Sequence, residues 1–285
     1  MKSCPYCGKE YPDDATTCLI DGESLPCNNP QPSISCEQIV DTPPDKNVPY
    51  LTFPDYQWSA RGAWRCLGMI IVFDIFLEII TLALDSRFSD FRKWHENGFG
   101  YFSTGVLHFA IYVLTAAYFA RTETLAAFLK GFSLDCKPSN YAWFGVTMAL
   151  IVRFFGHFML INGWGKGVLN HEYIAFKHTL GFERYFFLLP TLFLAPFFEE
   201  LLNRGFLYKA FRGSYPVGIS MALIVAWTAI SHWPYYSHSF LAAFCLSMIA
   251  IVQCYLREKS DSLWDCILCH FTFNASLLFV SAPLR

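Results

Sequence analysis

The chain has 285 residues, of which 54% are hydrophobic, 18% aromatic and only 15% charged, whereas soluble domains carry about 25% charged residues. Its mean hydropathy of +0.32 predicts a membrane protein. The 21 Lys and Arg residues are balanced by 23 Asp and Glu residues. Since no basic excess remains to hold a phosphate backbone, we exclude nucleic-acid binding.

The first 27 residues contain a cysteine pattern typical of a small zinc ribbon. Cys4 and Cys7 form a CxxC pair, and Cys18 follows in the run CPYCGKEYPDDATTCLID. Zn²⁺ takes four tetrahedral ligands, and a CxxC turn offers two thiolates at once. Asp21 is the predicted fourth ligand, with Cys27 as the alternative. The run resembles zinc ribbons with the pattern CPxCGxEYPDDAxxCxxDGxxL. The alternatives are a redox-active CxxC pair and a tail that binds no metal.

Residues 28–56 follow as a predicted flexible linker, since they contain PQP, TPP and VPY and few periodic apolar positions. No secretory signal opens the chain, because its first fifty residues are polar. We therefore expect a cytoplasmic N-terminus and a membrane domain over residues 57–285.

Seven apolar segments in that domain predict an all-α polytopic membrane protein. A helix rises 1.5 Å per residue, so about 20 apolar residues cross a bilayer. The loops predicted to be cytoplasmic carry a modest excess of Lys and Arg. The predicted spans are 66–84, 99–120, 141–161, 185–208, 217–233, 240–255 and 262–280.

The first and third segments carry charged groups at membrane depth. Asp74 and Glu78 lie one helical turn apart, as do Arg153 and His157. Because charges in a bilayer usually neutralise one another, we expect these two pairs to meet as structural ion pairs. A proton or transport path is the alternative.

The fourth segment contains APFFEELLNR, with two adjacent carboxylates and an arginine. Glu200 and Arg204 are four residues apart, so on a helix they can pair on one face. Glu199 lies about 100° away around the axis and lacks that partner. Glu199 is therefore the candidate functional carboxylate, and Glu200 with Arg204 is a neutralised pair that supports the site.

Two later segments add polar groups that could converge with Glu199. They are His232 in WTAISHW, and His270 with Asn274 one turn later in CHFTFN. Peptide hydrolysis needs an activated water and donors for the developing oxyanion. Glu199 and His232 would activate the water, while His270 and Asn274 would face the carbonyl oxygen. The alternative is a catalytic metal bound by the two histidines and a glutamate.

The order EExxxR, His and HxxxN over residues 185–280 resembles the CPBP family of intramembrane proteases, which includes CAAX-type prenyl endopeptidases and relatives linked to bacteriocin processing and immunity. The second motif differs, since Thr228 stands where the family has Phe. The resemblance implies an intramembrane endopeptidase, described in the family as either glutamate-dependent or a metalloprotease.

Together these features predict an endopeptidase that cuts a membrane-associated peptide or protein, such as a CAAX-like or leader peptide. Membrane lipid is the other expected partner, and zinc in the ribbon is the expected cofactor. The ribbon resembles bacterial tails, which implies a bacterial inner membrane. Two other classes of function stay open: an idle immunity or binding scaffold, and a transporter that uses Asp74, Glu78, Arg153 and the glutamate pair.

Overall fold

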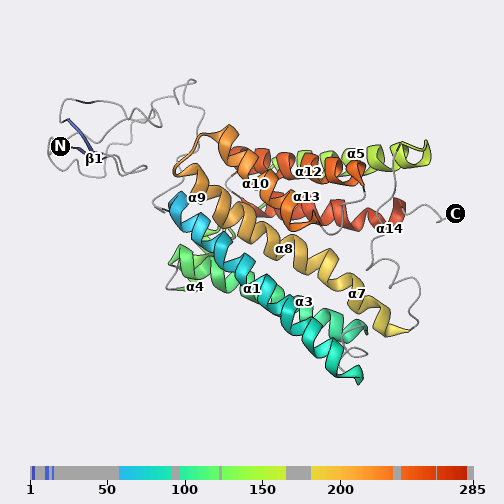
Figure 1. Cartoon of the computed structure of the whole chain (residues 1–285). Coiled ribbons are helices and arrows are strands. Elements are labelled where there is room, and N and C mark those ends of the chain that lie inside the picture. Colours follow the sequence, from blue (N-terminus) through green and yellow to red (C-terminus); the bar gives the residue numbers. More distant parts are fainter. Residues whose placement is uncertain are drawn as a thin grey trace.

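The computed structural model describes residues 2–3, 10–12, 15, 58–90, 97–121, 124–164, 181–233, 239–260 and 262–280. This part of the chain is almost entirely helical (Figure 1). The exceptions are strands β1 (Lys2–Ser3) and β2 (Glu10–Tyr11), which pair antiparallel. The predicted ribbon ligands lie outside the described residues; they are Cys4, Cys7, Cys18, Asp21 and Cys27.

Five helices in the described part of the chain are long and apolar enough to cross a membrane. They confirm the prediction of an all-α polytopic membrane protein. These helices are α1 (Ala60–Arg87), α3 (Gly98–Ala120), α5 (Tyr141–Ile161), the continuous run Tyr185–Arg212, and α12 (Phe240–Lys259). A short helix, α4 (Leu125–Gly131), follows α3.

The other two predicted spans are shorter than the sequence suggests. Helix α10 (Val217–Ser231) has 15 residues, which is about 22 Å at 1.5 Å per residue, less than the hydrocarbon thickness. The last segment is divided at Ser276 into α13 (Leu263–Ala275) and α14 (Leu277–Val280). The described residues thus hold five helices long enough to cross a membrane and two shorter helical segments at the remaining predicted positions.

The run Tyr185–Arg212 changes its helical pitch four times. After the 3₁₀ turn η1 (Phe182–Arg184) it passes through α7 (Tyr185–Leu189), the π-helical turn η2 (Pro190–Leu194), α8 (Ala195–Glu200), the π-helical turn η3 (Leu201–Leu207) and α9 (Tyr208–Arg212). Pro196 has no N–H for the carbonyl of Leu192, and its ring would crowd that carbonyl in a regular helix. A wider turn before Pro196 relieves this conflict, and π-turns are frequent at functional sites.

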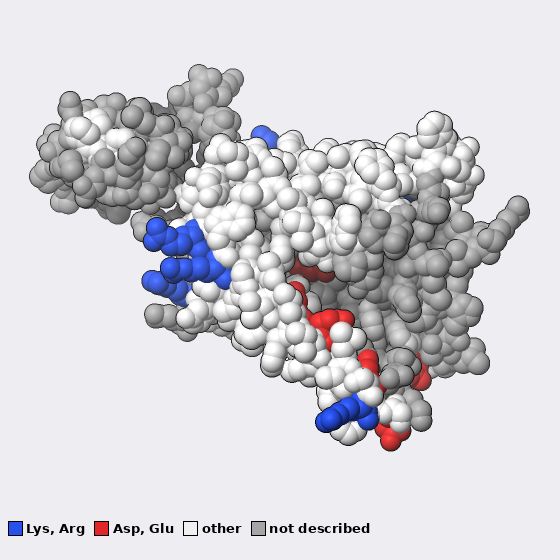
Figure 2. All heavy atoms as spheres, in the orientation of Figure 1, with Lys and Arg blue, Asp and Glu red and all other residues white. Residues whose placement is uncertain are grey.

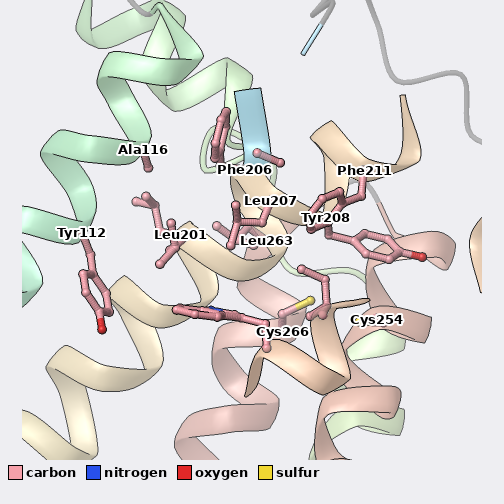
Figure 3. Packing of buried hydrophobic residues seen from close by; sticks show 14 of the residues in the cluster. Tyr112, Ala116, Leu201, Phe206, Leu207, Tyr208, Phe211, Cys254, Leu263 and Cys266 are labelled. Carbon is pink, nitrogen blue, oxygen red and sulfur yellow. The ribbon is translucent and has the colours of Figure 1, made fainter. Parts of the chain in front are cut away.

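This run lies between two groups of helices, one formed by α1 and α3 and the other by α5, α12 and α13 (Figure 1). Helix α8 contacts α3 on one side and α13 on the other. Figure 3 shows the same arrangement in the core, where Leu201 faces Tyr112 of α3 and Tyr208 lies toward Cys254 of α12. The two glutamates are therefore carried by the central element of the fold.

The outer surface of the long helices is apolar. On α1, Val72, Ile79 and Leu82 are each about 60% exposed. In water such a band would be costly, because it forms a contiguous apolar surface. Facing lipid it is expected, and it supports the assignment of α1 as a membrane span.

Candidate active site

Glu199 and His232 form the first half of the candidate site. Glu199 Oε2 lies 3.8 Å from His232 Nε2, and the two side chains are 18% and 24% exposed. This distance is too long for a direct hydrogen bond, but it suits two groups that share one water. The two residues come from α8 and from the C-terminal end of α10.

The backbone of α10 orients the His232 ring. His232 Nδ1 lies 2.9 Å from the carbonyl oxygen of Thr228, and because a carbonyl only accepts, Nδ1 carries the proton. Nε2 is then the unprotonated nitrogen of the neutral ring, and it faces Glu199. Thr228, which replaces the phenylalanine of the family pattern, is buried and bonds the carbonyl of Ile224.

Glu200 forms the second half of the site and is completely buried. Its Oε1 lies 3.2 Å from Arg204 Nη1, 2.8 Å from Gln253 Nε2 and 2.8 Å from His270 Nδ1. The three donors come from η3, α12 and α13. Glu200 thus has the arginine partner that the spacing predicts, together with two partners that the spacing does not reveal.

The contact with Glu200 limits what His270 can do. Since the carboxylate accepts, His270 Nδ1 donates, and only Nε2 can face a bound peptide. The side chain is 15% exposed, so part of the ring reaches the surface of the site. A neutral His270 could accept a hydrogen bond there, and a protonated one could donate to an oxyanion.

Asn274 lies one turn beyond His270 on α13. Its Nδ2 donates to the carbonyl oxygen of Thr191, at 2.8 Å. Thr191 belongs to the π-helical turn η2, so this amide ties α13 to the irregular part of the central run. One N–H of the same amide group is not used in this bond, and it could serve a substrate oxygen.

The space-filling view shows a hollow on one face of the molecule, along which Asp and Glu atoms gather (Figure 2). Glu199 and Glu200 are neighbours in sequence, yet they turn to different histidines on different helices. The two carboxylates of one short helix therefore each approach an imidazole from another helix, and Glu199 is partly exposed whereas Glu200 is buried.

Residues 181–276 match the family model of type II CAAX prenyl endopeptidases, Rce1-like. This match supports the CPBP family. It covers about a third of the chain and contains all six predicted site residues: Glu199, Glu200, Arg204, His232, His270 and Asn274. Neither the curated proteins nor the solved structures give a match to the chain.

The Rce1-like family is a protease family, so the match supports a protease that works within the membrane. The apolar helices and this match together support an integral membrane protein. Such a protease would act on a peptide or protein in the membrane.

Asp74 and Arg153, which lie outside the Rce1-like match, have contacts other than the predicted ones. Asp74 lies 3.7 Å from His108 Nε2 and accepts a hydrogen bond from the Tyr112 hydroxyl at 3.2 Å. Arg153 donates to Ser276 Oγ at 3.1 Å and to the carbonyl of Phe273 at 2.9 Å. Asp74 thus contacts side chains of α3, and Arg153 contacts Phe273 and Ser276, whereas a pair between the first and third spans was predicted.

The geometry of the donors bears on the metal-binding alternative. Within the described ranges, no three His, Cys, Asp or Glu side chains come together as a group that could hold a metal ion. His232 and His270 instead approach different glutamates. The set of two histidines and one glutamate is therefore not assembled in this conformation.

Gln253 is a site residue that sequence reasoning missed. It lies on α12, is 2% exposed and donates to Glu200. The only sequence signal is a polar amide in an otherwise apolar segment, and such a residue usually bonds a neighbouring helix. Nothing in the spacing indicates which group it bonds.

Proposed function

We propose that the chain is an intramembrane endopeptidase in which Glu199 and His232 activate the water that cleaves a peptide bond. The observation that carries this proposal is the 3.8 Å approach of Glu199 Oε2 to His232 Nε2 inside the segment that matches Rce1-like proteases. A water between them can donate one hydrogen bond to the carboxylate and the other to the unprotonated ring nitrogen. Its oxygen lone pair then remains available for attack.

His270 and Asn274 would stabilise the negative charge that develops on the carbonyl oxygen of the peptide bond. We infer that the second N–H of Asn274 donates to this oxygen, and that His270 Nε2 faces the same oxygen while Nδ1 is held by Glu200. Both side chains lie on one face of α13, four residues apart. Donors fixed in advance are worth about 100-fold or more in kcat.

We propose a membrane-associated peptide as the substrate, with CAAX-type prenylated peptides as the first choice, and the family match supports this proposal. We further propose that the end of the helix bundle at which α1 begins is cytoplasmic, and that the ribbon at Cys4, Cys7, Cys18 and Asp21 holds a structural zinc. Both proposals rest on sequence patterns, since charge bias sets topology and CxxC turns bind zinc.

The test is cleavage of a farnesylated CAAX peptide by purified protein in liposomes. Glu199→Gln removes the base but keeps the size, so we expect kcat to fall by about 100-fold to 10,000-fold. Asp135→Asn is the matched control, because Asp135 is an exposed carboxylate outside the spans, and it should cleave like wild type. Full activity in Glu199→Gln would disprove the mechanism.

The same cleavage assay distinguishes a structural zinc in the ribbon from a catalytic metal at the membrane site. Full-length protein with Cys4→Ser and Cys7→Ser should lose its bound zinc, still cleave, and tolerate a chelator. One retained zinc per chain, with cleavage lost to the chelator, would mean a catalytic metal at His232 and His270. If wild type cuts neither CAAX nor leader peptides, the scaffold alternative is favoured.

A further inference from the structure

Gln253 belongs to a hydrogen-bond network through which α12 contacts Glu200 and Arg204. Its Nε2 lies 2.8 Å from Glu200 Oε1. One turn earlier on α12, the carbonyl of Ala250 accepts from Arg204 Nη2 at 3.2 Å. Helix α12 therefore supplies one acceptor to the cation and one donor to the anion of the same ion pair.

All observed hydrogen bonds to Glu200 use one oxygen. Oε1 accepts from Arg204, Gln253 and His270. Oε2 is buried and has no hydrogen-bond partner among the described residues. The loss of one donor at Oε1 is therefore not compensated at Oε2, and the carboxylate could then rotate toward Arg204 and away from His270.

A neutral donor suits this position. Arg204 already neutralises the charge of Glu200. A second cation at position 253 would compete with His270 for that charge, and an anion there would repel Glu200. A glutamine amide adds a geometric constraint without changing the net charge of the cluster.

We propose that Gln253 is a positioning residue for the reaction, which holds the Glu200 carboxylate against His270 and thereby aims His270 Nε2 at the peptide bond. This inference rests on the proposed function. It adds a residue of α12 to a site whose predicted members come from α8, η3, α10 and α13. The competing explanation is a buried amide that only stabilises the fold.

The experiment is Gln253→Met, which keeps the length of the side chain and removes the donor. Loss of one hydrogen bond to a charged group corresponds to about 10-fold to 100-fold. We expect kcat for the CAAX peptide to fall by that factor with KM unchanged, when cleavage is measured well below the thermal midpoint of the variant. Ser247→Ala is the matched control, because Ser247 lies on the same helix and bonds only its own turn in the observed contacts, at Ala243.

A second comparison tests whether Gln253 acts through His270. In the background His270→Ala, Gln253→Met should lower kcat no further, since the ring that it positions is absent. An equal loss in both backgrounds, an unchanged kcat in Gln253→Met, or a fall explained by a lowered thermal midpoint would each overturn the proposal. Failure of the proposed function is separate, and it would be seen as activity in Glu199→Gln.

Discussion

At the scale of residues, the site depends on two adjacent glutamates with opposite environments. Glu199 is partly exposed beside His232, and Glu200 is fully buried among charged and polar donors. Successive residues of a helix point about 100° apart, so the two adjacent glutamates can contact two different histidines. The partly exposed carboxylate can reach water, whereas the buried one can only organise other side chains.

Replacing Glu200 should therefore affect folding more than replacing Glu199. Glu200→Gln leaves the Arg204 guanidinium, which is 2% exposed, without its carboxylate. An uncompensated buried charge costs about 3 kcal/mol or more. We expect a clearly lower thermal midpoint in detergent for Glu200→Gln and a nearly native one for Glu199→Gln. Equal midpoints in the two variants would show that the ion pair does not stabilise the fold.

At the scale of elements, close packing of α5 against α12 and α13 fixes the helix that carries His270. Gly145 makes this packing possible. A Cβ atom added there would lie 2.7 Å from Leu256 Cδ1 and 3.2 Å from Cys269 Cβ. Cys269 immediately precedes His270, so any shift at this contact reaches the site.

Gly145→Val should consequently destabilise the protein by about 1–3 kcal/mol, because overpacking forces helices apart. Catalysis should fall as well, since α13 would move relative to α8. The control is Gly68→Val on α1, where an added Cβ meets nothing within 4 Å. Thermal unfolding and peptide cleavage are measured for both. A native midpoint for Gly145→Val, or an equal loss in the control, would contradict this account of the packing.

At the scale of the whole molecule, one end of the helix bundle gathers basic residues beside the start of α1 (Figure 2). Contacts tie this end together: Trp58 Nε1 donates to the carbonyl of Ala120, and Lys209 Nζ donates to that of Gly131. The opposite end, where α1 stops, carries Arg87 as well as the acidic Asp90, so the charge bias between the two ends is modest. Lys and Arg are retained on the cytoplasmic side of membranes, so the first end is expected inside.

Labelling with a membrane-impermeant maleimide tests this orientation. Lys130 and Asp90 are exposed residues near the two ends. Asp90→Cys should be labelled in intact cells, and Lys130→Cys only after the membrane is opened, with labelled peptides identified by mass spectrometry. The reverse pattern would invert the proposed topology. Labelling of both cysteines in intact cells would argue against a membrane barrier between the two ends.

The sequence by itself determined the membrane class, the helical fold and the pairing of Glu200 with Arg204, because hydropathy and i,i+4 spacing are local properties. It also located the residues that carry the family match. It did not locate every helix end, since hydropathy does not show that a turn at Ser276 ends α13 or that α10 stops at Ser231.

Only the tertiary structure decided which polar groups meet. Asp74 meets His108 and Tyr112 instead of Arg153, and Glu200 gains Gln253 from a helix about 50 positions later in the chain. Such contacts depend on the rotation and depth of each helix in the bundle, which are set by the packing of many side chains. The sequence of a single apolar segment does not determine that rotation. The partners of its polar residues therefore become known only when the helices are assembled.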